Sequence, residues 1–130
     1  MKRVLFVCIE NSNRSQVAEA FAKIYGNGKV LAFSAGSSPL GIINPKAIES
    51  MGKLGYDLAS HSSKSVDSLK HETFDALITM GCGDDCPFIP ADLREDWNIP
   101  DPRNMSPDQY AEVRDLIAEK VKQLIKRLMP

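Results

Sequence analysis

A cysteine followed six positions later by an arginine and a serine stands near the start of the 130-residue chain, in the stretch CIENSNRS from Cys8 to Ser15. A cysteine attacks as the thiolate, and a nearby arginine or helix amino terminus favours that form. The planar guanidinium of Arg14 can meet two oxygens of a tetrahedral anion. Ser15 can cap a helix or donate its hydroxyl to the Cys8 sulfur. These residue types predict nucleophilic attack on a bound oxyanion.

The segments on either side of this stretch are predicted to form a strand and a helix. Residues 4–7 are apolar and precede Cys8, and the apolar spacing of a helix resumes at Val17, Phe21, Ile24 and Tyr25. Ligands of open α/β sheets bind at the carboxyl ends of strands, where a helix amino terminus offers unpaired N–H groups. We therefore expect an oxyanion to bind at Ile9, Glu10, Asn11, Ser12, Asn13, Arg14 and Ser15.

The alternative is that Cys8 is a buried structural thiol and Arg14 an ordinary surface charge. From average residue frequencies, a chance match to this spacing in a chain with three cysteines has odds of roughly one in a hundred. The requirement for a strand before the loop and a helix after it lowers those odds further. The pattern therefore favours a functional loop.

The stretch CIENSNRS, followed by QVAEAF, resembles the phosphate-binding loop of the low-molecular-weight protein tyrosine phosphatases and of the arsenate reductases that share their fold. The resemblance extends over nearly the whole chain and implies a single low-molecular-weight phosphatase-like domain over residues 1–130. It also implies that Cys8 is the nucleophile, that Arg14 and the loop amides bind the oxyanion, and that Asn11 braces the loop.

Two loop positions depart from the family pattern. Glu10 stands where many members have glycine, and its carboxylate would repel a bound dianion unless it pointed to solvent. Because the amides of an anion-binding loop face inward and its side chains tend to face outward, we expect Glu10 to be tolerated, and Glu10→Gly to change turnover only modestly. Asn13 replaces a cysteine common in the reductases, which removes a thiol that could compete with Cys8 for oxidation.

The composition is that of an ordinary soluble globular domain, with 43% hydrophobic residues, 25% charged residues and a formal net charge of −1. It offers no basic footprint for nucleic acid. The apolar run after Lys2 and Arg3 ends by Ile9, too short for a signal peptide or a membrane span. We expect a cytoplasmic monomer without membrane or nucleic-acid partners. Thiols stay reduced in that compartment, so the three cysteines favour catalysis, redox chemistry or metal binding over a disulfide framework.

Further along the chain, predicted strands and helices alternate. Strands are predicted at residues 29–34 and 74–80, and the small residues Ser34, Ala35 and Gly36 would let the chain pass near the oxyanion loop. Such alternation implies a parallel sheet with helices on both faces. Together with right-handed crossovers and the family resemblance, it predicts a flavodoxin-like three-layer α/β/α fold whose four-stranded parallel sheet has the order 2-1-3-4.

Capping signals place the later helices. Asn44 followed by proline starts a helix that Gly55 should stop, and Ser106 with Gln109 forms a capping box for the last helix. The fourth strand comes only from the resemblance, which implies a strand at residues 96–100.

The Asp101-Pro102 pair follows that segment, at the position where the family carries its general acid on a mobile loop. Proline restricts Asp101 to extended geometry, which would aim its carboxyl across the site. By the resemblance, Asp101 protonates the leaving oxygen. Tyrosine phosphatases carry aromatic residues just after this pair, whereas here Arg103 and Asn104 follow. The lack of an aromatic platform favours a small inorganic anion.

Cys82 and Cys86 follow the third predicted strand and resemble the thiol shuttle of the arsenate reductases. By that resemblance, Cys82 attacks the arsenic-bearing Cys8, arsenite leaves, and Cys86 then forms a disulfide with Cys82. Gly81 and Gly83 would supply the required freedom of motion. Thioredoxin or a similar thiol system would reduce that disulfide. The spacing between Cys82 and Cys86 is shorter than in thioredoxin-coupled members of the family, so the identity of the reductant stays open.

Two alternatives exist for these cysteines. They could be inert loop thiols, or they could bind zinc, but three cysteines without a nearby histidine leave a zinc site incomplete. We therefore expect no metal and no cofactor.

His61 and His71 receive no role. Some reductases of the family hold a potassium ion with an aspartate that aligns with Lys64, so the Lys64 ammonium could replace that cation.

Three functions remain distinguishable at this point. The leading hypothesis is reduction of arsenate to arsenite by a Cys8, Cys82 and Cys86 relay, with phosphatase activity on the side. The alternative is a low-molecular-weight protein tyrosine phosphatase that hydrolyses phosphomonoesters through a phosphocysteine intermediate. A third possibility is a module that binds phosphate without turnover, with Glu10 blocking the chemistry. The intact set of Cys8, Arg14 and Asp101 argues against it.

Overall fold

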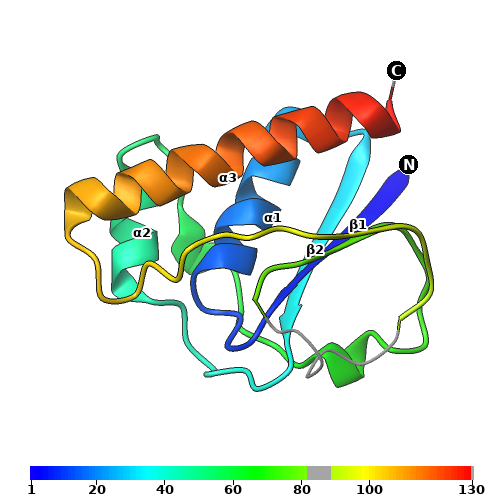
Figure 1. The fold of residues 1–130 in the computed structure, drawn as a ribbon, viewed down its shortest axis with the longest axis horizontal. Helices are drawn as coiled ribbons and strands as arrows, with labels where there is room; N and C mark the ends of the chain where they lie inside the picture. Colours follow the sequence, from blue (N-terminus) through cyan, green and yellow to red (C-terminus); the bar gives the residue numbers. More distant parts are fainter. Residues whose placement is uncertain (82–88, 130) are drawn as a thin grey trace.

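The computed structural model describes residues 1–81 and 89–129 (Figure 1). In chain order its elements are β1 (Lys2–Cys8), α1 (Arg14–Gly26), β2 (Val30–Gly36), α2 (Pro45–Gly52), the 3₁₀ helices η1 (Leu58–Ser60) and η2 (Val66–Ser68), β3 (Phe74–Thr79), β4 (Ala91–Asp96) and α3 (Pro107–Leu128). The four strands form one sheet in the order β2-β1-β3-β4, and every neighbouring pair is parallel. The predicted flavodoxin-like class and strand order are confirmed.

The central strand β1 separates two apolar clusters. Side chains alternate across a strand, so Phe6 packs with α1 and α3 on one face, while Leu5 and Val7 pack with the segment around η2 on the other. Figure 1 shows α3 running alongside α1, with α2 near one end of the molecule. Coverage of both faces explains why residues 4–8 read as an unbroken apolar run.

Local signals account for the starts of α2 and α3, at the caps Asn44 and Ser106. Ser106 and Gln109 form the predicted capping box of α3. The predicted end of α2 is wrong: the helix stops at Gly52, and Gly55 lies in the following turn with φ of +82°. A glycine inside a helix costs about 1 kcal/mol relative to alanine, which favours the earlier end. Ser15 is also not a cap, because α1 begins one residue earlier, at Arg14.

The implied position of the fourth strand is wrong as well. β4 covers Ala91–Asp96, and residues 97–100 run on from its end toward the site. Half-exposed and exposed residues alternate along β4, as is typical of an edge strand. Such a strand offers no apolar run, so its sequence carries little signal.

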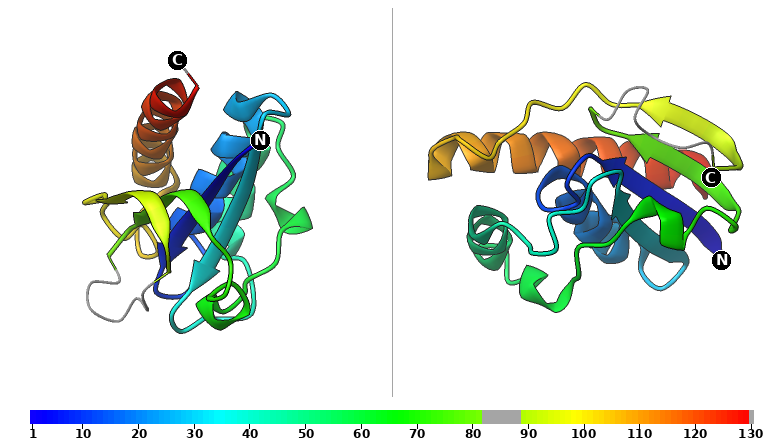
Figure 2. Two further views of the ribbon diagram at one scale, coloured as in Figure 1. Left: turned by 90° about the vertical axis from the view of Figure 1, so that its right-hand side faces the viewer. Right: turned by 90° about the horizontal axis from the view of Figure 1, so that it is seen from below.

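The two ends of the sheet lie near different parts of the molecule. The amino end of β1 and the carboxyl end of α3 lie at one end of the molecule, and α2 lies at the other (Figures 1 and 2). Cys8 is the last residue of β1, and residues 97–101 follow the end of β4. Both segments therefore lie at the carboxyl edge of the sheet. Within the described residues, no helix has the length and apolar character needed to cross a membrane.

Candidate active site

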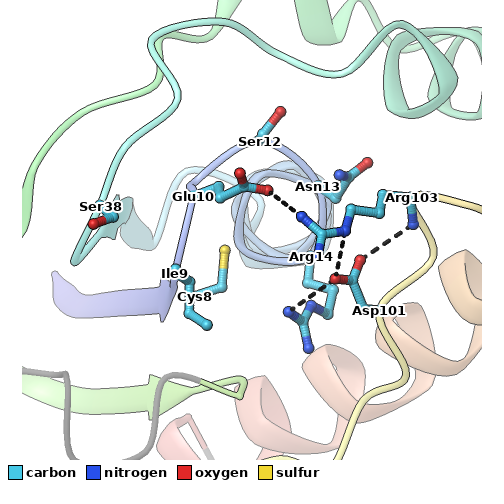
Figure 3. Close-up of a pocket in the computed structure, with 9 residues that line it drawn as sticks. All are labelled: Cys8, Ile9, Glu10, Ser12, Asn13, Arg14, Ser38, Asp101 and Arg103. Carbon is cyan, nitrogen blue, oxygen red and sulfur yellow. Dashed lines mark hydrogen bonds and ion pairs between the residues drawn. The ribbon is translucent and has the colours of Figure 1, made fainter.

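Cys8 is one of the residues that line a pocket at this edge (Figure 3). Its side chain is almost fully buried, and its sulfur lies 2.8 Å from Ser15 Oγ. Asn11 Nδ2 donates a hydrogen bond to the same hydroxyl oxygen at 2.8 Å. Since Ser15 Oγ already accepts from Asn11, its own hydrogen is available to the Cys8 sulfur. The predicted serine-to-cysteine contact is therefore present.

The loop backbone is held by hydrogen bonds from the segment that follows β2. The carbonyls of Cys8, Ile9, Glu10 and Ser12 accept hydrogen bonds from amides of residues 37–44, outside the loop. In a planar trans peptide the N–H points opposite to the C=O, so the amides that follow these carbonyls point away from the segment 37–44. Asn11 has a positive φ of 50°, as expected where a loop bends to gather its amides. This arrangement suits a tetrahedral anion.

Asn11 also ties the loop to the rest of the fold. Its side-chain oxygen accepts hydrogen bonds from Gln16 Nε2 and from the backbone amide of Lys64, both at 2.9 Å. Gly36 passes so close that a Cβ there would lie 2.5 Å from the Ile9 carbonyl oxygen. The expectation that small residues at the end of the second strand let the chain approach the loop is confirmed.

Arg14 and Asp101 occupy the other side of the pocket, whose volume is about 190 Å³. Arg14 Nη1 donates to the Ile99 carbonyl at 3.0 Å, and Arg14 Nη2 lies 4.0 Å from Asp101 Oδ2. The lining residues are Cys8, Ile9, Glu10, Ser12, Asn13, Arg14, Ser38, Asp101 and Arg103. This volume is below the roughly 300 Å³ at which pockets for drug-sized ligands begin, so the space suits a small anion.

Glu10 does not extend freely into solvent. Its carboxylate lies 3.2 Å from Arg103 Nη1, and Arg103 Nε lies 3.2 Å from Asp101 Oδ2 (Figure 3). The Arg103 guanidinium therefore offsets the negative charge of Glu10, which by itself would repel a bound dianion.

Behind the loop, the structure assembles a buried polar cluster that sequence reasoning missed. His61 Nδ1 lies 3.0 Å from Gln16 Oε1 and 3.3 Å from Glu19 Oε2, and His61 Nε2 lies 2.6 Å from the Tyr56 hydroxyl. No role was assigned to His61 from the sequence, yet its side chain is only 2% exposed and has three polar partners. Lys64 Nζ lies 3.7 Å from Glu19 Oε1. A histidine in a serine-rich loop carries no pattern that would have revealed these partners.

Burial and charge shift the titrations in this cluster. Burial lowers the pKa of His61 and of Lys64, because it disfavours their charged forms. Burial by itself would raise the pKa of Glu19. Hydrogen bonds from Lys23 and Ser34, with the charges of His61 and Lys64, outweigh it and hold the pKa of Glu19 below its ordinary value.

Asn13 has a structural partner in α3. The buried Tyr110 hydroxyl donates to Asn13 Oδ1 at 2.8 Å. Burial, with smaller effects from the charges of Asp101 and Cys8, raises the pKa of Tyr110, so this hydroxyl stays protonated as a donor. The asparagine that replaces a family cysteine thus anchors the loop to α3.

Cys82 and Cys86 lie outside the described residues, so the relay predicted for them stays a prediction. Among the residues that the structure does describe, no group of three or more histidine, cysteine, aspartate or glutamate side chains is placed to hold a metal ion.

Fold and site together define a class: a parallel α/β domain that presents a buried cysteine and an arginine to an anion-sized pocket. A family model described as "Low molecular weight phosphotyrosine protein phosphatase" matches residues 3–129. The chain is 35% identical over 131 aligned positions to the glutaredoxin arsenate reductase of Synechocystis sp., covering 98% of this chain and 99% of the relative. The chain therefore belongs to the low-molecular-weight phosphotyrosine protein phosphatase family.

Solved structures show the same relationship. One described as an arsenate reductase in the phosphate binding state superposes with a TM-score of 0.87 at 35% identity, over 98% of each chain. A thioredoxin-dependent arsenate reductase of Corynebacterium glutamicum gives a TM-score of 0.79 at 32% identity, over 98% of this chain and 61% of that one. The family resemblance noted from CIENSNRS is confirmed.

Proposed function

We propose that this protein reduces arsenate to arsenite. The observation that carries the proposal is the pocket itself, which Cys8, Arg14 and Asp101 line together. Arg103 follows Asp101 where the phosphatases carry aromatic residues, which favours a small inorganic anion over an aryl ester. The similarity to arsenate reductases supports the same choice.

In the first step, the Cys8 thiolate attacks arsenic while the loop amides and Arg14 hold the arsenate oxygens. A sulfur–arsenic bond forms and one arsenic–oxygen bond breaks. The leaving oxygen takes a proton from the Asp101 carboxyl and departs as water. Arsenic remains As(V) in this adduct, and Ser15 stabilises the Cys8 sulfur whenever it carries negative charge.

The two-electron reduction comes from the thiols. The Cys82 thiolate attacks the Cys8 sulfur, and the electron pair of the sulfur–arsenic bond stays on arsenic, which leaves as As(III) arsenite. The Cys8–Cys82 disulfide is then attacked by the Cys86 thiolate, which forms a Cys82–Cys86 disulfide and restores the Cys8 thiolate. An external dithiol reduces that disulfide for the next turnover.

We propose thioredoxin or a similar thiol system as the electron source. Two relatives carry names that point to thiol donors, one to glutaredoxin and one to thioredoxin. A cytoplasmic location fits this chemistry, because thiols are kept reduced there. The enzyme would act as a monomer without a bound cofactor, and without nucleic-acid or membrane partners.

Phosphomonoester hydrolysis is the second candidate, and the match to the phosphotyrosine phosphatase family model favours it. Cys8 would then form a phosphocysteine, Asp101 would protonate the leaving phenol, and water would release phosphate. This route needs neither Cys82 nor Cys86.

The test is arsenate-dependent NADPH oxidation, coupled through thioredoxin and its reductase and, in parallel, through glutaredoxin, glutathione and glutathione reductase. Wild type should turn over with at least one system, whereas Cys82→Ser and Cys86→Ser should lose multiple turnover and retain aryl-phosphate cleavage. Without external reductant, Cys86→Ser should still release one arsenite per enzyme and Cys82→Ser none. Cys8→Ser should lose every activity.

The protein would instead be a phosphatase if the wild type cleaves aryl phosphates but oxidises no NADPH with arsenate, and if Cys82→Ser and Cys86→Ser leave that cleavage unchanged. Loss of both activities in the wild type would leave a binding module.

A further inference from the structure

Three charged side chains that line the pocket are joined by ion pairs. Arg103 Nη1 lies 3.2 Å from Glu10 Oε1, and Arg103 Nε lies 3.2 Å from Asp101 Oδ2. Figure 3 shows Arg103 between the two carboxylates, with Asp101 between Arg103 and Arg14. We call the Glu10–Arg103–Asp101 set the rim clasp. It joins the oxyanion loop to a segment 93 residues away.

The backbone around Asp101 is held as well. The Arg103 amide donates to Asp101 Oδ1 at 3.2 Å, and Lys46 Nζ donates to the carbonyls of Arg103 and Met105 at 2.8 and 3.1 Å. The turn itself is therefore anchored through α2. The Arg103 side chain contacts the second carboxylate oxygen, Oδ2, at 3.2 Å, and Arg14 Nη2 lies 4.0 Å from the same oxygen.

We propose that Arg103, held in place by Glu10, is a positioning residue that keeps the Asp101 carboxyl directed over the pocket for proton transfer. This rests on the role of Asp101 as proton donor in the proposed function. A guanidinium suits the task, because its planar fork can contact two carboxylates at once, which a lysine ammonium on a flexible stem does less well.

Two observations distinguish Arg103 from an anion ligand. Its guanidinium faces two carboxylates, which offset its charge, and its side chain is 53% exposed, against 12% for Arg14. Arg14 instead comes from the first residue of α1, directly after the oxyanion loop. Loss of Arg103 should therefore impair protonation of the leaving group rather than binding of the anion.

The experiment compares two aryl phosphates that differ in their need for an acid. Phenyl phosphate releases a basic phenolate that requires a proton, whereas 2,4-dinitrophenyl phosphate releases a weakly basic one that does not. The rate of phenol release is followed in a single turnover over a range of substrate concentrations, which separates chemistry from binding. The variants are Asp101→Asn, Arg103→Gln, Arg103→Lys, Glu10→Gln and the Glu10→Gln/Arg103→Gln double variant.

General acid catalysis contributes about 10²- to 10⁴-fold, so Asp101→Asn should slow phenyl phosphate cleavage by about 100-fold. Arg103→Gln should slow it by about tenfold and Glu10→Gln by about threefold, each without weakening substrate binding, while dinitrophenyl phosphate should change less than about twofold. Arg103→Lys should recover part of the loss. Because Glu10 acts through Arg103, the double variant should match Arg103→Gln alone.

The matched control is Arg127→Gln, which removes an arginine of another exposed pair, Arg127 with Glu95, on α3 and β4. It should leave both substrates unaffected. Equal losses on both phosphates, weaker substrate binding in Arg103→Gln, or additive effects in the double variant would each overturn the positioning role.

A second measurement needs no turnover. Hydrogen exchange of the amide of residue 103, which donates to Asp101 Oδ1, should accelerate in Glu10→Gln and in Arg103→Gln, and should not in Arg127→Gln. Unchanged exchange in the two clasp variants would refute the clasp even in an enzyme that hydrolyses no aryl phosphate. An enzyme that fails to reduce arsenate but shows the leaving-group effect would refute the proposed function and leave the clasp intact.

Discussion

Gly81 follows β3 and lies against the Arg14 guanidinium, which makes it a sharp test of how the anion site is built. Its φ is +88°, and a Cβ at this position would lie 2.7 Å from Arg14 Nη1. Gly81→Ala should therefore strain the backbone and push the guanidinium aside. The sequence suggested only that Gly81 lends mobility to the neighbouring cysteine, whereas the structure shows that it also makes room for Arg14.

The size of the effect follows from these distances. To restore an ordinary contact of 3.4 Å, the guanidinium must move by about 0.7 Å, which disturbs its 3.0 Å hydrogen bond to the Ile99 carbonyl. A misplacement of about 1 Å can cost about 100-fold in rate. We expect Gly81→Ala to lower kcat/KM by about 10- to 100-fold, and to lower the free energy of unfolding by about 1–2 kcal/mol from the positive φ.

Gly55→Ala separates the two effects. Gly55 has a similar φ of +82°, but a Cβ there meets nothing within 4 Å. Urea unfolding should show comparable destabilisation in both variants, whereas arsenate reduction and aryl-phosphate cleavage should fall only in Gly81→Ala. Wild-type kcat/KM in Gly81→Ala would show that the contact with Arg14 does not control anion binding.

Three further predictions concern the loop and the cluster behind it. Ser15→Ala should slow alkylation of Cys8 by iodoacetamide about tenfold at neutral pH, because a hydrogen bond to a charged sulfur contributes about 1.5–3 kcal/mol; an unchanged rate would deny Ser15 this role. Burial lowers the pKa of His61 below 6.5, so near that pH the unfolded chain binds more protons than the folded protein does. The free energy of unfolding should therefore decrease as the pH is lowered from about 7 to about 5. Urea titrations should show a flatter profile in His61→Gln, and a flat wild-type profile would contradict the reasoning. Because the Lys64 ammonium lies 3.7 Å from Glu19, arsenate reduction should be equal in K⁺ and Na⁺ and should become K⁺-dependent in Lys64→Asp; steep stimulation of wild type by K⁺ would rule this out.

Prediction from sequence succeeded where the signal is local. The apolar run that ends at Cys8 and the capping box at Ser106 each involve neighbouring residues, and both appear in the structure as predicted. The order of the sheet followed from alternation of elements and the handedness of crossovers together with the family resemblance. β4 was misplaced because an edge strand with one exposed face offers no apolar run.

The site divides in the same way. Cys8, Arg14 and Ser15 lie within seven residues of one another, so the strand, the loop and the start of the helix already bring them together. The sequence by itself therefore determined that these three side chains share one loop. The partners of the site are distant in sequence: Arg103 meets Glu10 from 93 positions away, and His61 meets Gln16 from 45. Only the packing of crossover segments onto one edge of the sheet decides such contacts, because no local pattern encodes which remote side chain will face the loop.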